Sequence, residues 1–237
     1  MNPVWVIAKK EIGSFFNSLV GYMIVAVFLI LSGLFTWLLG NDIFMSQQAN
    51  LNVFFGWAQW ILLLVIPAIT MKQIAEENKT GTIELLLTKA LSIRQLVLGK
   101  FLACLLMVGI IFLFTLPYYF SVAQLGDVDH GAIISGYIGL LVLSAAYIAI
   151  GLFASSLTSN QIVAFLLALF LCFWFQFIFG FLGNYSSGIM GDILSSISMG
   201  EHYNSLARGV IDTKDLVYFG SVIFFFLFWA EINVSKK

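Results

Sequence analysis

The sequence predicts an all-α integral membrane protein with six transmembrane helices in a single transmembrane domain, 1–237. Of its 237 residues, 61% are hydrophobic and 10% are charged, and the mean hydropathy is +1.01, whereas soluble domains carry about 25% charged residues. Six apolar runs approach or reach the roughly 20 helical residues that cross a bilayer core. None shows the alternating ten-residue pattern of a transmembrane barrel.

The elements are expected in the following order. Residues 3–18 form an amphipathic helix that lies in the membrane interface, with Lys9 and Lys10 toward the head groups; the alternative is a plain extension of the first span. The spans are expected at 19–40, 53–71, 101–124, 133–155, 162–183 and 216–230. The outer loop 184–215 is long for a connection in a compact protein, so short helices are expected within it.

The fourth span is rich in small residues, which let helix backbones approach closely. Ala145 and Ala149, and likewise Gly151 and Ser155, are four positions apart and share a helix face. This spacing favours internal packing over a dimer face.

The basic residues predict the orientation, because cytoplasmic loops carry an excess of lysine and arginine. With both termini inside, nine of the eleven basic residues lie inside, and only Arg208 and Lys214 lie outside. The 72–100 segment is therefore expected to be cytoplasmic. The predicted location is the inner (plasma) membrane of a bacterial cell, crossed several times, with both termini cytoplasmic.

The polar 72–100 segment is predicted to form a helix, a turn, a short transverse helix and a new helix entering the third span. Gly81 permits the turn, and Ser92 with Gln95 has the form of a capping box at the start of the last helix. Between them an apolar stripe recurs at helical spacing, at Ile83, Leu86, Leu87 and Ala90. A stripe of this kind needs a partner or the membrane surface to cover it. The alternative is a solvated charge cluster that only sets topology.

The sequence offers no catalytic, cofactor-binding or metal-binding residues and no feature of nucleic-acid binding. No charge lies near the centre of a span, which argues against a proton pump. Gly99 and Lys100 do not form a phosphate loop, because the spacing fails and no Ser or Thr follows. Cys104 and Cys172 are expected to be apolar fillers. Two polar residues inside spans are expected to join helices: Gln59 and Gln176.

Residues 76–87 read Glu-Glu-Asn-Lys-Thr-Gly-Thr-Ile-Glu-Leu-Leu-Leu, and Leu-Gly-Lys follows at 98–100. This pattern resembles the permease subunits of type-2 ABC transporters, which share acidic–acidic–x–x–x–Gly–Thr–x–Glu–x–Leu and a Gly-Lys entering the third span. The six spans and the long last outer loop extend the resemblance over the chain. More narrowly, residues 15–22 and 206–212 resemble the gliding-motility-associated permeases of that group.

The resemblance implies two permease halves, as a homodimer or heterodimer surrounded by membrane lipid, above two cytoplasmic ATP-binding subunits. ATP would be hydrolysed on those separate chains, so this chain is not itself an enzyme. The segment after the second span would be a coupling helix that docks on the ATP-binding subunit. The matching positions are Glu76, Glu77, Lys79, Gly81, Thr82, Glu84, Leu86 and Leu87. The resemblance also implies re-entrant helices in the outer loop, over about 189–212.

The expected function is therefore that of the membrane-spanning permease subunit of an ATP-driven exporter linked to gliding motility. Two alternatives remain: a passive channel or membrane scaffold without ATP coupling, and a secondary transporter.

Overall fold

A computed structural model describes residues 2–39, 50–82 and 92–236 of the chain. In these residues every regular element is a helix, and six are long and apolar enough to cross a membrane, which confirms the predicted fold class. The six are α2 (Leu19–Trp37), α4 (Asn52–Thr80), α6 (Ile93–Ala123), α7 (His130–Leu157), the continuous unit Gln161–Tyr185, and α12 (Thr213–Ser235). The continuous unit consists of α8 (Gln161–Phe173), the π-helix η1 (Trp174–Ile178) and α9 (Phe179–Tyr185).

Three shorter helices lie outside these spans: α1 (Pro3–Phe16), α10 (Ile189–Ile197) and α11 (Met199–Ala207). Helix α1 begins at Pro3, with the Asn2 side chain accepting from the Val4 N–H at 3.1 Å. This is a favoured start, because proline at the first helical position loses no intrahelical hydrogen bond. The predicted short helices of the outer loop are present as α10 and α11.

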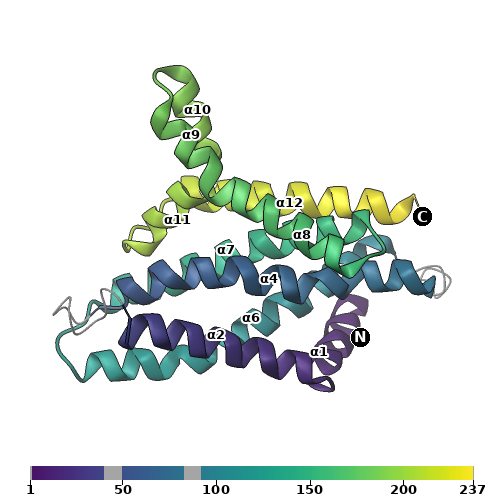
Figure 1. Cartoon of the computed structure of the whole chain (residues 1–237), viewed down its shortest axis with the longest axis horizontal. Coiled ribbons are helices and arrows are strands. Elements are labelled where there is room, and N and C mark those ends of the chain that lie inside the picture. The colour runs from purple at the N-terminus through teal and green to yellow at the C-terminus, as the bar shows by residue number, and fades with distance from the viewer. Residues whose placement is uncertain (1, 40–49, 83–91, 237) are drawn as a thin grey trace.

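Helix α7 is the centre of the molecule and packs against α4, α12, α8, α11 and α6. Figure 1 shows α1 lying across one end of the long axis, while α9 and α10 stand out from the body nearer the other end, beside α11. The apolar window of α7 is 78% buried, against 28% for α2 at the periphery. Helix α7 is thus the element against which the other spans are positioned.

The seam between α4 and α7 is formed by small residues of α7. A Cβ atom at Gly151 would lie 2.1 Å from the Thr70 Oγ1 atom, and Ala145, Ala149 and Ser155 are buried in the same helix. The prediction that these residues serve internal packing is confirmed. The predicted joining role of the two glutamines is confirmed as well, because Gln176 of η1 donates to the Gln59 side chain of α4 at 2.8 Å.

Helix α4 is longer than a membrane span requires. Its 29 residues extend about 43 Å at 1.5 Å per residue, whereas the hydrocarbon core is about 30 Å thick. The last turns of α4 therefore extend past the expected end of the second span, at residue 71. They carry the polar residues that form the candidate site.

Candidate functional site

The end of α4 is fixed by local hydrogen bonds. Gly81 adopts a left-handed conformation with φ 67°, and its N–H bonds to the Glu77 carbonyl. A residue with a side chain is strained in this conformation, so glycine is the natural helix terminator here. The Thr80 hydroxyl donates to the Glu76 carbonyl at 2.9 Å and lies 3.0 Å from the Thr82 hydroxyl. The predicted turn at Gly81 is confirmed.

The start of α6 is fixed by the predicted capping box. The Ser92 hydroxyl accepts from the Gln95 N–H, and the Gln95 side chain accepts from the Ser92 N–H, both at 3.2 Å. Two turns later, Gly99 faces α1, where an added Cβ would lie 2.7 Å from the Ile7 side chain. The absence of a side chain at Gly99 lets α1 approach α6, so that Lys100 lies beside α1 and the end of α4.

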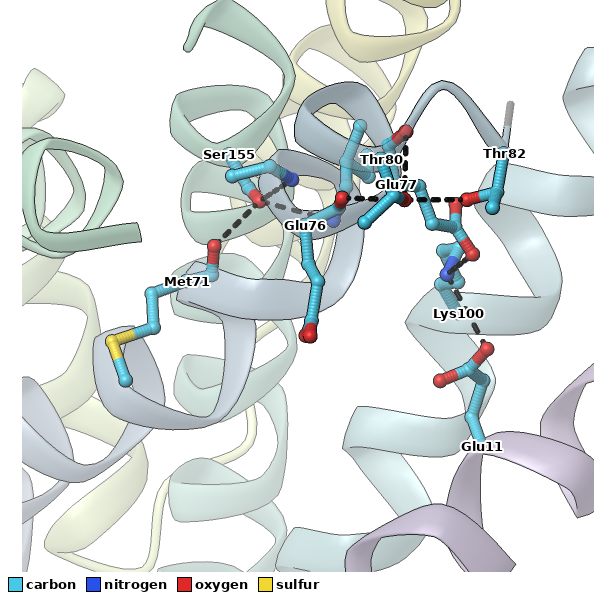
Figure 2. A network of polar contacts seen from close by, with 10 residues as sticks. Glu11, Met71, Glu76, Glu77, Thr80, Thr82, Lys100 and Ser155 are labelled. Atoms are coloured by element: carbon cyan, nitrogen blue, oxygen red, sulfur yellow. Dashed lines mark hydrogen bonds and ion pairs between the residues drawn. The ribbon is translucent and has the colours of Figure 1, made fainter. Parts of the chain in front are cut away.

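Lys100 is the centre of a buried ion cluster. Its side chain is only 1% exposed, and its Nζ donates to Glu77 Oε1 at 2.7 Å and to Glu11 Oε1 at 3.3 Å. Figure 2 shows the ammonium group between the two carboxylates, which come from α4 and α1. Three helices are thus joined by one cation. Because removing charges from water is costly, each member depends on the others for compensation.

A cavity of about 460 Å³ opens beside this cluster, between α1, the end of α4 and the start of α6. Three lysines and three glutamates line it together with polar residues; the lining is Lys10, Glu11, Ser14, Lys72, Gln73, Glu76, Glu77, Thr80, Thr82 and Lys100. The Glu77 Oε2 atom is buried and has no hydrogen-bond partner among the described residues. The cavity wall is therefore charged, balanced in sign, and suited to contact with a polar partner surface.

The end of α4 is also joined to α7. The Ser155 hydroxyl accepts from the Ile74 and Ala75 N–H groups at 3.1 and 3.0 Å and donates to the Met71 carbonyl at 3.0 Å (Figure 2). One turn further along α4, Asn78 donates from its side chain to the carbonyl of Thr158, just after α7. Polar contacts thus fix the projecting part of α4 to the central helix.

Replacement of Ser155 by alanine is expected to lower the free energy of unfolding by about 1–3 kcal/mol, because a buried side chain that bonds to the backbone of α4 is lost. The matched control is Ser121→Ala, since the exposed Ser121 hydroxyl donates to the Pro117 carbonyl of its own helix and to no other described residue. Unfolding in mixed micelles with a denaturing detergent measures both. Equal stability of the two variants would contradict the role given to Ser155.

Five of the eight positions indicated by the resemblance lie in the described residues. Glu77 belongs to the ion cluster, Glu76 and Thr82 line the cavity, Gly81 ends α4, and Lys79 is exposed on its last turn. The remaining three fall outside the described residues, together with the predicted transverse helix: Glu84, Leu86 and Leu87.

The sequence interpretation missed Lys100 and Glu11 as partners of Glu77. An available indication was the lysine at the very start of an apolar run, which requires a counter-charge nearby. In the part of the chain that the structure describes, no group of acidic, histidine and cysteine side chains could hold a metal ion, and the two cysteines are buried and unpaired. The described residues of this region are thus connected by ion pairs and hydrogen bonds between α1, α4, α6 and α7.

A family model described as ABC-2 family transporter protein matches residues 5–234, which is nearly the whole chain. No curated protein matches it significantly.

Proposed function

We propose that this chain, which belongs to the ABC-2 family of transporter proteins, exports its cargo with energy from a separate ATP-binding subunit docked at the 72–100 segment. Membership of the family makes the chain a multi-pass permease subunit of an ABC transporter. The finer proposals concern where the ATP-binding subunit docks, how its motion reaches the spans, and how the chain lies in the membrane.

The buried Lys100 cluster carries the proposal. It joins the projecting end of α4 to α1 and α6 through ion pairs of 2.7 and 3.3 Å, and Ser155 joins the same end to α7. A subunit that pushes on this end moves four helices together. Such rigid-body movement at a packed interface is an established mode of conformational transmission.

Orientation in the inner membrane is part of the proposal. Figure 1 places α1, the C-terminus and the far end of α4 at one end of the long axis, and α11 at the other. The end with α1 and the C-terminus carries most of the basic residues, and this excess favours its placement on the cytoplasmic side. In this orientation the cavity beside Lys100 faces the cytoplasm, where ATP-binding subunits are located.

Pairing with a second permease half and a link to gliding motility are further proposals. Both are supported by sequence resemblance, the latter by residues 15–22 and 206–212. Direction of transport is proposed as export on the same ground.

The docking proposal is tested by reversing one charge in the 72–100 segment and placing a charge in its apolar stripe. We expect the double substitution Glu84→Arg with Leu86→Asp to abolish co-purification of an ATP-hydrolysing subunit from solubilised native membranes. The matched control is Asp127→Arg with Leu125→Asp, which makes the same two changes at exposed positions between α6 and α7, outside the segment. Mass spectrometry of the co-purified proteins and ATPase activity are the two measurements.

Normal recovery of the ATP-hydrolysing subunit with the Glu84 and Leu86 variant would overturn the docking proposal. If even the wild-type chain recovers no ATP-hydrolysing subunit while a passive flux persists in vesicles, the chain works as a channel instead.

A further inference from the structure

A second buried charged pair lies far from the Lys100 cluster, in the region of α11 and the start of α12. The His202 Nδ1 atom of α11 is 2.7 Å from the Asp215 Oδ1 atom of α12, and each side chain is 7% exposed. The permease function proposed above makes no use of this pair. Its two members are separated by a turn and the first residues of α12, so their contact fixes one helix against the other.

The geometry determines how many protons the pair holds. The His202 Nε2 atom lies 3.1 Å from the Ser196 carbonyl oxygen, which can only accept, so Nε2 carries a hydrogen. The other ring nitrogen faces a carboxylate at 2.7 Å, and one proton must lie between these two atoms for the contact to be attractive. With that proton on Nδ1, the contact is an ion pair between an imidazolium ring and the Asp215 carboxylate.

The same side chain holds the C-terminal end of α10. His202 bonds to Ser196 in the last turn of α10, and its ring stacks on Tyr218 of α12 with a centroid separation of 4.0 Å and an interplanar angle of 18°. The Tyr218 hydroxyl in turn donates to the Ile197 carbonyl at the last residue of α10. His202 of α11 and Tyr218 of α12 thus both hold the end of α10, and α10 otherwise packs mainly on α9.

The remaining environment is poor in charge. The other titratable side chains of α10, α11 and the beginning of α12 with its cap are Asp192, Glu201, Tyr203, Asp212, Lys214 and Tyr218, and none of them forms a described ion pair with His202 or Asp215. Helices α7 and α9 and the π-helix η1 also pack against α11. They contain no acidic or basic residue apart from His130 at the start of α7. The second Asp215 oxygen is buried without a hydrogen-bond partner among the described residues.

We propose that His202 and Asp215 form a proton-dependent clasp that holds α10 and α11 against α12. When one of the two ring protons is transferred to hydroxide in alkaline medium, the remaining hydrogen stays on Nδ1 toward the carboxylate, and the Nε2 lone pair then faces the Ser196 carbonyl, so the contact with α10 becomes repulsive. The end of α10 is then released, together with the α9–α10 projection seen in Figure 1. The clasp does not depend on which ATP-binding subunit drives the transporter.

The protonation state is tested by nitrogen-15 NMR of histidine-labelled protein in lipid nanodiscs. The chain has only two histidines, so His130→Gln assigns the spectrum by removing one of them. At neutral pH both His202 ring nitrogens are expected to give protonated signals. An unprotonated His202 nitrogen at neutral pH in the wild-type chain would overturn the proposal, and this measurement requires no change in the clasp itself.

Hydrogen exchange of residues 189–212 tests the clasp. In Asp215→Asn the amide can donate to a neutral Nδ1 while Nε2 still donates to Ser196, so the contact becomes independent of the proton. The wild type and this variant are expected to exchange equally at neutral pH, and the wild type about tenfold faster in alkaline buffer, as loss of a charged hydrogen bond implies. Asp215→Ala, which has no donor, is expected to exchange fast at both pH values.

Comparing variants at the same pH removes the intrinsic pH dependence of exchange. Asp212→Asn is the matched control, because it neutralises a nearby carboxylate while leaving a residue that can still cap α12. The ratio of its exchange rate to that of the wild type is expected to stay the same at both pH values. If the ratio of the wild-type exchange rate to that of Asp215→Asn does not change with pH, the clasp is overturned.

Discussion

The variant Lys100→Met is expected to lose about 3 kcal/mol or more of its free energy of unfolding, because removing one partner of a buried ion pair leaves the other charge uncompensated. Glu77 and Glu11 approach the ammonium group at 2.7 and 3.3 Å, and both carboxylates are largely buried. With methionine in place of the lysine, two negative charges remain close together at the junction of three helices. Detergent-induced unfolding in mixed micelles measures the loss.

A triple variant without any charge in the cluster separates the effect on stability from the effect on force transmission. Adding Glu11→Gln and Glu77→Gln to Lys100→Met removes the stranded charges, and neutral replacement of a buried ion cluster is often nearly neutral for stability. This triple variant is expected to regain most of the stability and still fail to stimulate its ATP-binding subunit. Lys9→Met, on the exposed side of α1, is the matched control, because Lys9 neither lines the cavity nor belongs to the 72–100 segment. If Lys100→Met is as stable as this control, the cluster does not hold the three helices together.

The boundaries of the candidate site were predictable from the sequence because they depend on local backbone chemistry. Gly81 ends α4 in a left-handed conformation, and the capping box of Ser92 and Gln95 starts α6, as the sequence predicts. The number of membrane-spanning helices was also predictable, because the length of a continuous apolar run determines whether a helix can cross a bilayer.

The partners of Lys100 were not predictable, because they depend on how distant helices pack. Glu11 is 89 positions away in the chain, and its contact requires α1 to lie against α6 at Gly99, where no side chain intervenes. The sequence shows a lysine at the start of an apolar span and an amphipathic helix near the N-terminus, but no pattern indicates that the two meet.

The pair of His202 and Asp215 illustrates the same limit at shorter range. Thirteen positions separate the two residues, and helical periodicity does not connect them, because the chain turns between α11 and α12. Burial distinguishes this pair from the exposed His130, and burial of a polar residue in a loop region has no reliable sequence pattern. The small residues of α7, in contrast, were informative because their four-residue spacing is itself a packing pattern.

The variant Gly151→Val is expected to lower the free energy of unfolding by about 1–3 kcal/mol, the usual cost of forcing extra atoms into a packed core. An added Cβ would lie 2.1 Å from the Thr70 Oγ1 atom and 2.8 Å from its Cβ, so α4 and α7 must move apart. Separation at this level also disturbs the Ser155 contacts one turn away. Both the free energy of unfolding, measured in mixed micelles, and the stimulation of the ATP-binding subunit are expected to fall.

Gly109→Val is the matched control, because Gly109 lies within another span and no atom approaches its added Cβ within 4 Å. The helix-propensity cost of valine is shared by both variants, so their difference isolates the clash. Thr70→Gly combined with Gly151→Val removes the side chain that obstructs the valine and is expected to regain part of the loss. Should Gly151→Val prove no worse than Gly109→Val, the two helices are not tightly joined. Movement at the end of α4 would then reach α7 only through the polar contacts of Ser155 and Asn78.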